Sequence, residues 1–370
     1  MDFSSLSNVH TAKPTVVHIL WDGDFGGIQR IVKNVFLDDT TSLFRHVAIL
    51  AGHFGPMIGP AASDRFCLGM KSGFDIFAFL KLRKILKKIP DSIFVYHLDT
   101  PIFRLLFNKY GPTVYLEHGC TAKRDKFRKF NKLLGTRFFS QCEKIVCISK
   151  QIQGAIVSLY PRYASKTLVI NNPVTIPFGK SRAHPHDPVV IGFIGRFSPE
   201  KGPREFIQCA IGLHDSCPSV VFKMVGDGPL LRECKDFARQ SGIPVEFTGT
   251  TSSIADELAS IDIVAVTSVK DAFNMVIVEA MASGVPVAAY PVGGIPEIIT
   301  NNVTGLLSEL KSPESLEISI ERILREKNLY AKLSSNAHIH ARKNYGLNEY
   351  RKKWEDVFLS ANSSFAKAAV

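Results

Sequence analysis

The pattern of hydrophobic and polar positions along this chain alternates between short apolar runs and longer amphipathic segments. Short apolar runs such as 15–21 (TVVHILW), 144–149 (KIVCIS) and 189–196 (VVIGFIGR) read as buried strands. Most are followed by stretches in which apolar residues recur at spacings of three and four, as in an amphipathic helix. Strands that alternate with helices in this way predict an α/β protein whose parallel sheets are covered by helices on both sides.

The pattern breaks once and then restarts. Residues 171–188 (NNPVTIPFGKSRAHPHDP) contain four prolines and no periodicity, so a linker and a domain boundary are expected there. We expect a first domain over 1–178 and a second over 186–346. His184 and His186 are interpreted as residues of a solvated linker, not as metal ligands.

The stretch 271–286 (DAFNMVIVEAMASGVP) carries the most specific local pattern. It predicts a loop that holds Asp271, followed by a helix that holds Glu279 and is stopped by Gly284 and Pro286. The free N–H groups at such a helix start favour an anion. The plainer interpretation is an ordinary strand-loop-helix unit with a surface glutamate.

Two cations lie together after the strand 189–196. Arg196 and Lys201 fall in the loop between that strand and the next helix, at a position where two cations and free N–H groups would neutralise a diphosphate. The alternative is that both are ordinary surface charges.

The loops of the first half carry weaker signals. Gly26 and Gly27 follow the first strand, but they do not complete the GxGxxG pattern of an NAD site, and they are interpreted as a place where backbone approaches a ligand. Asp22 and Asp24 lack a third ligand, so no metal site is predicted. His118 follows another strand, at the carboxyl end where α/β sheets bind ligands.

Composition narrows the choice of function. The 370 residues are 45% hydrophobic, and neither a spanning apolar run nor a signal-peptide pattern is found, so a cytoplasmic globular protein is expected. The seven cysteines form no CxxC pair, which supports neither a zinc site nor a disulfide framework. The phosphate-binding, esterase and zinc-protease motifs of common hydrolases are also missing.

The net charge of +11 indicates an anionic partner. Basic residues gather in two segments of the first half: Lys81, Arg83, Lys84, Lys87 and Lys88 in one, and Lys123, Arg124, Lys126, Arg128, Lys129, Lys132 and Arg137 in the other. Basic amphipathic helices of this kind bind anionic lipid surfaces. A solvated helix face is the alternative, and nucleic acid is disfavoured because aromatic residues are not interleaved.

Five ordered motifs of the second half resemble those of the family 4 glycosyltransferases, which have the GT-B fold. They are GRFSPEKG (195–202), VGDGP (225–229), FTGT (247–250), the Asp271 to Glu279 pair followed by AMASGVPV, and PVGGIPEII (291–299). In the first half, FGGIQR (25–30) and EHG (117–119) carry the resemblance.

The resemblance implies two Rossmann-like, doubly wound domains that face each other across a cleft, with residues 347–370 returning to the first domain as a helix. It implies a metal-independent hexosyltransferase that uses a UDP- or GDP-linked sugar, retains the anomeric configuration and needs no other cofactor. The residues that match the family's site are His118, Arg196, Lys201, Asp271 and Glu279 for catalysis, and Gly26, Gly27, Gly226, Gly228, Phe247, Gly249, Asn274, Met275 and Val276 for binding.

The family's usual roles attach to these positions. Arg196 and Lys201 would hold the diphosphate and Glu279 the ribose. Around the base would lie Gly226 to Gly228 and Phe247 to Gly249, while the N–H groups of Asn274 to Val276 would face the phosphates and sugar. Gly26 and Gly27 would lie near the acceptor and phosphate, and His118 beside the donor sugar.

One departure concerns donor choice. The family usually has Glu followed by Gly-Phe-Gly where this chain has Asp271 followed by Ala272, Phe273 and Asn274. The first carboxylate contacts sugar hydroxyls, so a shorter side chain beside a bulkier neighbour is expected to alter which sugar fits.

The basic first half indicates a lipid-linked saccharide acceptor, such as a lipopolysaccharide, O-antigen or capsule precursor, reached from the inner face of the cytoplasmic membrane. A nucleotide-sugar epimerase or phosphorylase of the same architecture, and an inactive nucleotide-sugar-binding scaffold, are the alternatives.

Overall fold

A computed structural model describes residues 13–24, 26–60, 64–71, 75–89, 92–97, 111–119 and 128–368. The chain divides into two compact units. The first combines Met1–Asn171 with Leu347–Val370, and the second is Asn172–Gly346.

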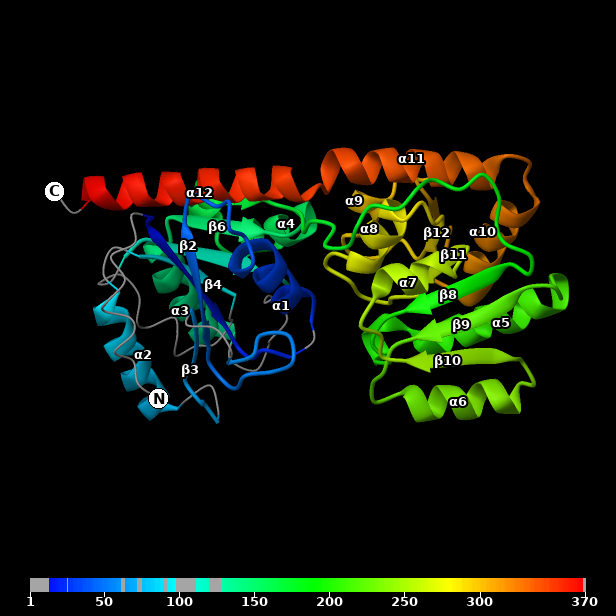
Figure 1. Ribbon diagram of the computed structural model, residues 1–370, viewed down its shortest axis with the longest axis horizontal. Coiled ribbons are helices and arrows are strands. Elements are labelled where there is room, and N and C mark those ends of the chain that lie inside the picture. The colour runs from blue at the N-terminus through cyan, green and yellow to red at the C-terminus, as the bar shows by residue number, and fades with distance from the viewer. Residues whose placement is uncertain are drawn as a thin grey trace. The chain divides into compact units, whose positions relative to one another are not determined.

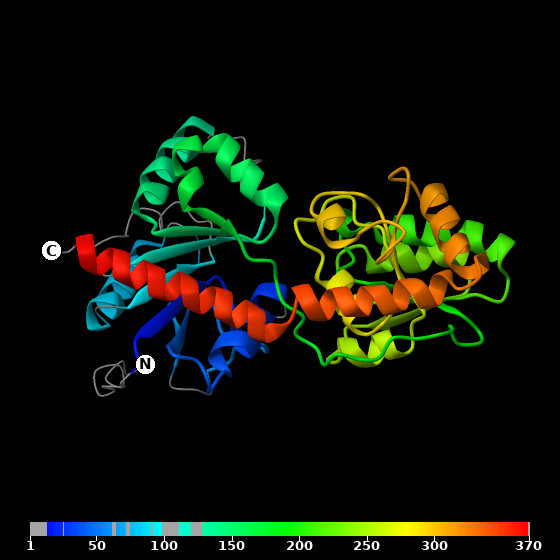
Figure 2. The same ribbon diagram turned by 90° about the horizontal axis from the view of Figure 1, so that it is seen from above.

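The first unit is built on a parallel sheet with the strand order β3-β2-β1-β4-β5-β6-β7. Its strands are β1 (Thr15–Leu20), β2 (Arg45–Leu50), β3 (Arg65–Cys67), β4 (Ile93–Tyr96), β5 (Thr113–Glu117), β6 (Lys144–Cys147) and β7 (Thr167–Val169). Its helices are α1 (Gly27–Ile31), α2 (Ile76–Lys88), α3 (Arg128–Gln141), α4 (Lys150–Leu159) and α12 (Leu347–Ala368), with a 3₁₀ turn over Pro161–Lys166. Helices lie on both faces of this sheet (Figure 2).

The central strands of this sheet are buried almost throughout, as parallel strands covered on both faces must be. The strand order reverses between β1 and β4. Loops at the carboxyl ends of two such strands turn to opposite faces and leave room for a ligand.

The helix predicted after the glycine loop is not a regular α-helix. Only α1 is α-helical, and the chain continues as a π-helix over Val32–Leu37. The wider turns bury Val32, Val35 and Phe36. The spacing of three and four did not reveal this stretch, because the buried residues of the π-helix, Val32, Val35 and Phe36, themselves lie three and four positions apart.

The C-terminal helix α12 belongs to the first unit (Figure 1). Trp354 and Phe358 are each 1% exposed. The Trp354 ring meets Phe36 edge-on at 5.8 Å between centroids, and Phe358 meets Phe44 at 5.3 Å. These aromatic contacts attach the helix to the π-helical segment and the loop that follows it.

The second unit has a parallel sheet with the order β10-β9-β8-β11-β12-β13. Its strands are β8 (Val190–Ile194), β9 (Val221–Val225), β10 (Val245–Gly249), β11 (Ile263–Val266), β12 (Val287–Ala289) and β13 (Leu306–Leu307). Its helices are α5 (Pro203–Ser216), α6 (Leu231–Gln240), α7 (Ile254–Ala259), α8 (Met275–Ala282), α9 (Ile295–Ile298), α10 (Pro313–Arg325) and α11 (Leu329–Asn344), with a 3₁₀ turn over Pro199–Lys201.

The segment predicted to be a solvated linker is irregular and mostly exposed between residues 179 and 188, but it is attached to the second unit, which begins at Asn172 and not at 186. Arg182 donates to the Ile261 carbonyl at 2.7 Å. The buried Asp262 accepts from the His186 backbone N–H at 2.9 Å and pairs with His186 Nδ1 at 2.8 Å. These contacts join residues far apart in sequence and leave no periodic pattern.

Of the helices that the structure describes, none combines the length and the apolar character needed to cross a bilayer.

Candidate functional site

The sequence-predicted residues of the second half gather where the strand order of their sheet reverses. Strands β8 and β11 are neighbours in that sheet, although β9 and β10 lie between them in sequence. Arg196 and Lys201 follow β8, and Asp271 follows β11, all at carboxyl ends. This is the position at which doubly wound sheets bind ligands.

A direct contact joins the two loops. Lys201 Nζ lies 2.7 Å from Asp271 Oδ2, and the two side chains are 32% and 8% exposed. The same carboxylate oxygen accepts from Asn274 Nδ2 at 2.8 Å and from Ser268 Oγ at 3.4 Å. Three donors therefore fix the position of the Asp271 carboxylate before any ligand binds.

Asn274 has a role that the sequence did not reveal. Its Oδ1 accepts from the Ile277 N–H at 3.2 Å and caps α8, while its Nδ2 holds Asp271. The side chain is buried and has both ends occupied. The N–H groups of Met275 and Val276 have no acceptor within the helix and lie at its positive end.

Glu279 lies one turn further along α8 and is 1% exposed. This excludes the surface glutamate considered above. The helix then ends as predicted, with Gly284 in the left-handed region at φ +69°.

Two glycines outside the predicted set hold these loops together. Gly202 has φ +65°, and a Cβ there would collide with the Thr267 carbonyl. Gly293 has φ +59°, and a Cβ there would collide with the Asp271 carbonyl. The signal for both was present, since both glycines belong to the quoted motifs, but the contacts span 65 and 22 residues of sequence.

Gly226 and Gly228 keep a third loop close to Arg196. Both have positive φ, and a Cβ would strike the Gly195 carbonyl in the first case and the Phe197 carbonyl in the second. Phe247 packs near Phe197, with 6.2 Å between ring centroids. Gly249, at φ +75°, has open space where its Cβ would be, and Arg196 is exposed.

In the first unit, Gly26 precedes α1 and Gly27 opens it, so both lie at the carboxyl end of β1. The carboxylates of Asp22 and Asp24 make contacts that hold this loop in place. Asp22 accepts from Gln29 Nε2 at 2.8 Å, and Asp24 pairs with His53 at 3.0 Å.

His118 lies in a turn directly after β5. The buried Glu117 carboxylate accepts from the Gly119 N–H at 2.9 Å and from the Tyr115 hydroxyl at 3.0 Å, which fixes this turn. His118 Nε2 lies 3.1 Å from His97 Nδ1. Although part of its side chain reaches the surface of the unit, desolvation lowers the pKa of His118 to about 3.

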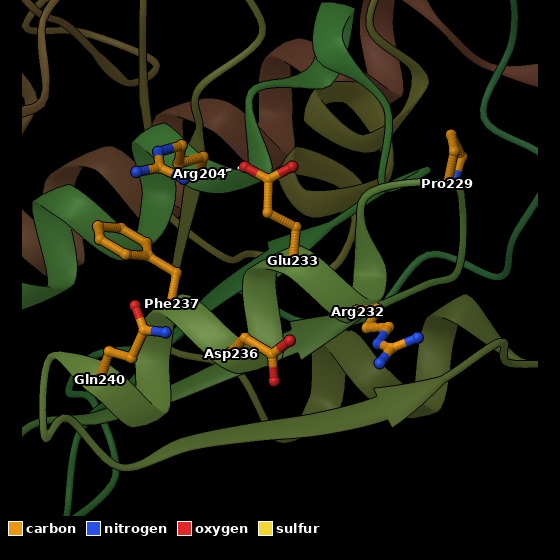
Figure 3. A pocket seen from close by; sticks show the side chains of 7 residues that line it. All are labelled: Arg204, Pro229, Arg232, Glu233, Asp236, Phe237 and Gln240. Carbon is orange, nitrogen blue, oxygen red and sulfur yellow. Dashed lines mark hydrogen bonds and ion pairs between the residues drawn. The ribbon is translucent and has the colours of Figure 1, made fainter.

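A separate pocket on the second unit contains none of the predicted site residues. It is lined by Arg204, Pro229, Arg232, Glu233, Asp236, Phe237 and Gln240 (Figure 3). Arg204 and Glu233 point toward each other there, with 2.9 Å between Nη1 and Oε1, and the Arg204 guanidinium lies 4.2 Å from the Phe237 ring centroid. Since Arg204 is paired with Glu233, and Asp236 places a second carboxylate in the same lining as Arg232, this pocket is the weaker candidate for an anionic ligand.

Comparisons with known proteins agree with this architecture. The family described as glycosyl transferases group 1 matches residues 178–340, and Glycosyltransferase Family 4 matches residues 46–176. An uncharacterized glycosyltransferase of Methanocaldococcus jannaschii is 30% identical over 241 residues, which are 63% of this chain and 64% of that protein. A 2-deoxystreptamine glucosyltransferase of Streptomyces kanamyceticus is 32% identical over 139 residues, or 36% of each chain. The matched stretches thus span less than two thirds of these relatives.

The crystal structure of HepE from Anabaena in complex with UDP-glucose superposes with a TM-score of 0.75 at 20% identity, and the match covers 94% of this chain and 99% of that one. This similarity shows that the two α/β units form a GT-B fold. The two family matches, one over each half of the sequence, show that the chain belongs to the family 4 glycosyltransferases, with a group 1 glycosyltransferase domain in its second half.

Proposed function

We propose that this protein is a metal-independent, retaining hexosyltransferase that moves a sugar from a nucleotide-sugar donor to a saccharide acceptor. The observation that carries the proposal is the pairing of Lys201 with Asp271 beside the start of α8. It brings a cation, free N–H groups and a fixed carboxylate to the reversal point of one sheet.

In this proposal Lys201, Arg196 and the first N–H groups of α8 bind the diphosphate. Negative charge builds on the departing nucleoside diphosphate as the glycosidic bond breaks, and donors fixed in advance stabilise that charge without reorganising. These groups would take the place of a metal ion. The buried Glu279 hydrogen-bonds the ribose, and the loops of Gly226 to Gly228 and Phe247 to Gly249 surround the base.

Asp271 would orient the donor sugar. All three of its contacts named above use Oδ2, so Oδ1 is the atom offered to a sugar hydroxyl. Asn274 acts on the sugar through Asp271, because its own amide is occupied by the helix start and by the carboxylate. Exchanging this Asp-Asn pair is therefore expected to change sugar preference more than nucleotide affinity.

The first unit would receive the acceptor near Gly26 and Gly27 and place His118 beside the donor sugar. UDP-glucose is the first donor to test, because HepE was crystallised with it and the Streptomyces kanamyceticus relative is a glucosyltransferase. GDP-linked and ADP-linked sugars complete the set.

A thermal-shift screen over these donors tests the proposal, since a ligand that binds the native state raises the melting temperature. We expect one nucleotide sugar to stabilise the protein and Glu279→Gln to weaken that effect. Incubation of the stabilising donor with candidate saccharides should then release the nucleoside diphosphate and form a glycoside of unchanged anomeric configuration. A protein that no nucleotide or nucleotide sugar stabilises would contradict the donor assignment, and an inverted product would contradict retention.

The acceptor is proposed to be a saccharide linked to lipid, at the inner face of the cytoplasmic membrane. On α2, the side chains of Phe77 and Leu80 are 85% and 46% exposed, and Arg83, Lys84 and Lys87 are exposed beside them. An exposed aromatic ring among cations is the pattern of a helix that lies on anionic lipid. Lys123, Arg124 and Lys126 of the second basic segment lie outside the described residues.

Co-sedimentation with vesicles tests this surface. We expect binding to anionic vesicles but not to neutral ones, weakened by salt. Phe77→Ser and Lys84→Glu should each reduce binding, while the matched change Leu359→Ser, at an exposed apolar residue of α12, should not. Equal binding by all three variants, or no binding by the native protein, would favour a soluble acceptor.

A further inference from the structure

Four histidine side chains of the first unit are joined in a line across its sheet. His46 on β2, His18 on β1, His97 after β4 and His118 after β5 come from four neighbouring strands. The facing ring nitrogens are 3.1 Å apart from His46 to His18, 3.2 Å from His18 to His97 and 3.1 Å from His97 to His118. At the far end, Ser42 Oγ lies 3.0 Å from His46 Nε2.

The register of the sheet explains why these rings meet. His18 pairs with Ala48, which is two residues beyond His46, and with Val95, which is two residues before His97. The same offset of two residues relates His97 after β4 to His118 after β5, because the register of these strands aligns Tyr96 with Tyr115. Because side chains alternate with a period of two, each step stays on one face of the sheet while moving toward its carboxyl edge.

Apolar rings cover this line. Phe36 of the π-helical segment stacks on His18 at 4.6 Å between centroids, and Phe358 of α12 lies 5.9 Å from His46. Desolvation lowers the pKa of His18 and His97 well below the ordinary value, and it lowers the pKa of His46 to about 4. Among the described residues, the charged groups that act on the line are Asp39 and Arg351, both at the His46 end. All four rings are therefore neutral at neutral pH.

Neutral rings in such a line must all point the same way. Each neutral imidazole carries one N–H, so an inner ring that shares both nitrogens donates on one side and accepts on the other. The three bonds then have two collective arrangements: every ring protonated at Nδ1, or every ring protonated at Nε2. A line of neutral rings that combined both tautomers would contain one contact in which two N–H groups, or two nitrogens without a proton, face each other.

Ser42 selects between the two arrangements. The buried Ser42 Oγ accepts from the Phe44 N–H at 3.1 Å, and within the described residues His46 Nε2 is the acceptor in reach of its hydroxyl proton. Donation from Ser42 to His46 Nε2 sets the Nδ1–H form along the whole line. His118 Nε2 then accepts from His97, and His118 Nδ1 carries the proton.

We propose that the other three histidines of the line, His46, His18 and His97, are positioning residues that lock His118 in its neutral Nδ1–H form. The lock presents this N–H, at the carboxyl end of β5, to a hydroxyl oxygen of the bound donor sugar. The proposal rests on the function proposed above for its substrate class. A metal site is a poor alternative, since the nitrogens face one another in pairs, and in the described part of the chain no three His, Cys, Asp or Glu side chains converge as metal ligands would.

Nitrogen NMR of the protein labelled with ¹⁵N-histidine tests the lock, because the two neutral tautomers give different ring-nitrogen shifts. We expect His118 of the native protein in the Nδ1–H form. Ser42→Ala should redistribute it between both forms, although two rings separate His46 from His118, and Ser42→Thr should restore the native form because it keeps the hydroxyl. An Nε2–H ring in the native protein, or a His118 tautomer unchanged by Ser42→Ala, would overturn the proposal.

Kinetics supply the second measurement. His97→Phe removes the donor to His118 and should lower kcat about 10- to 100-fold, by analogy with the loss of a hydrogen-bond partner that orients a metal-ligating histidine. The thermal shift produced by the nucleoside diphosphate of the donor found in the screen should be unchanged in this variant. Equal kcat in His97→Phe and the native protein would overturn the positioning role. A native protein that transfers no sugar would contradict the proposed function, while the tautomer measurement would still decide the lock.

Discussion

Replacing Lys201 by Met removes the cation that we place at the leaving group and keeps most of the aliphatic stem. In the free protein Lys201 Nζ is 2.7 Å from Asp271 Oδ2, and the carboxylate is 8% exposed. The substitution thus has two consequences. The diphosphate loses a stabilising charge, and an almost buried carboxylate is left without its cation beside the incoming phosphates.

The expected loss in kcat/KM is at least about 100-fold, or about 2.7 kcal/mol, as found when one fixed donor to a developing negative charge is removed. Stability should fall by about 1–2 kcal/mol, less than for a fully buried pair because Lys201 is 32% exposed. The melting temperature of the second unit should then drop by a few degrees.

Lys223→Met is the matched control. Lys223 Nζ lies 2.8 Å from Glu257 Oε2 in the same unit, and both side chains are largely buried. Its loss should cost similar stability and leave kcat/KM unchanged, whereas Lys201→Arg should retain part of the activity. The assay is the initial rate of nucleoside diphosphate release with the donor found in the screen. Near-normal turnover in Lys201→Met, or equal activity losses in the two Met variants, would refute the reasoning.

Two further predictions concern the first unit. The unfolded chain protonates its histidines below about pH 6.5, whereas folding holds the pKa of His46 at about 4 and that of His118 at about 3. The free energy of unfolding should therefore fall as the pH drops from 6.5 toward 4. The loss should reach up to about 1.4 kcal/mol per pH unit for each histidine of the line. Urea denaturation at pH 7 and pH 5 measures this change, and unchanged or greater stability at pH 5 would contradict the prediction. Asp39 and Asp75 do not obscure the comparison, because their lowered carboxyl pKa values affect stability only below about pH 4. Trp354→Ala should destabilise the first unit by about 3–5 kcal/mol, since a fully buried ring is lost. Leu359→Ala, at a half-exposed position of the same helix, should cost less than about 0.5 kcal/mol, and similar losses in both variants would show that α12 contributes no specific packing.

The elements near the site were largely predictable because their signals are local. A strand, a polar loop, a helix start and a terminating glycine fall in order between β11 and the end of α8. The spacing of Asp271 and Glu279 fixed which residue lies in the loop and which in the helix. It did not reveal that Glu279 is buried, because the 3.6-residue period assigns a face only once the neighbouring elements are known.

The predicted linker shows the limit of local reasoning. Four prolines and no periodicity describe residues 171–188 correctly as irregular, yet the segment is packed on its unit by Arg182 and by the buried Asp262. An irregular, largely exposed segment can be held in place when a few of its polar groups find partners. No pattern within the segment identifies partners 76 to 79 residues away.

The sequence by itself determined the alternation of strands and helices, the glycines that demand positive φ, and the ordered motifs of the glycosyltransferase family. Only the tertiary structure decided that Lys201 meets Asp271 across 70 residues, and that four histidines separated by 28, 79 and 21 residues form one line. Local patterns follow from sterics and burial within one element. Long-range contacts depend on which strands become neighbours and in what register, and a register shift of one residue in any of these strands would turn its histidine to the other face of the sheet.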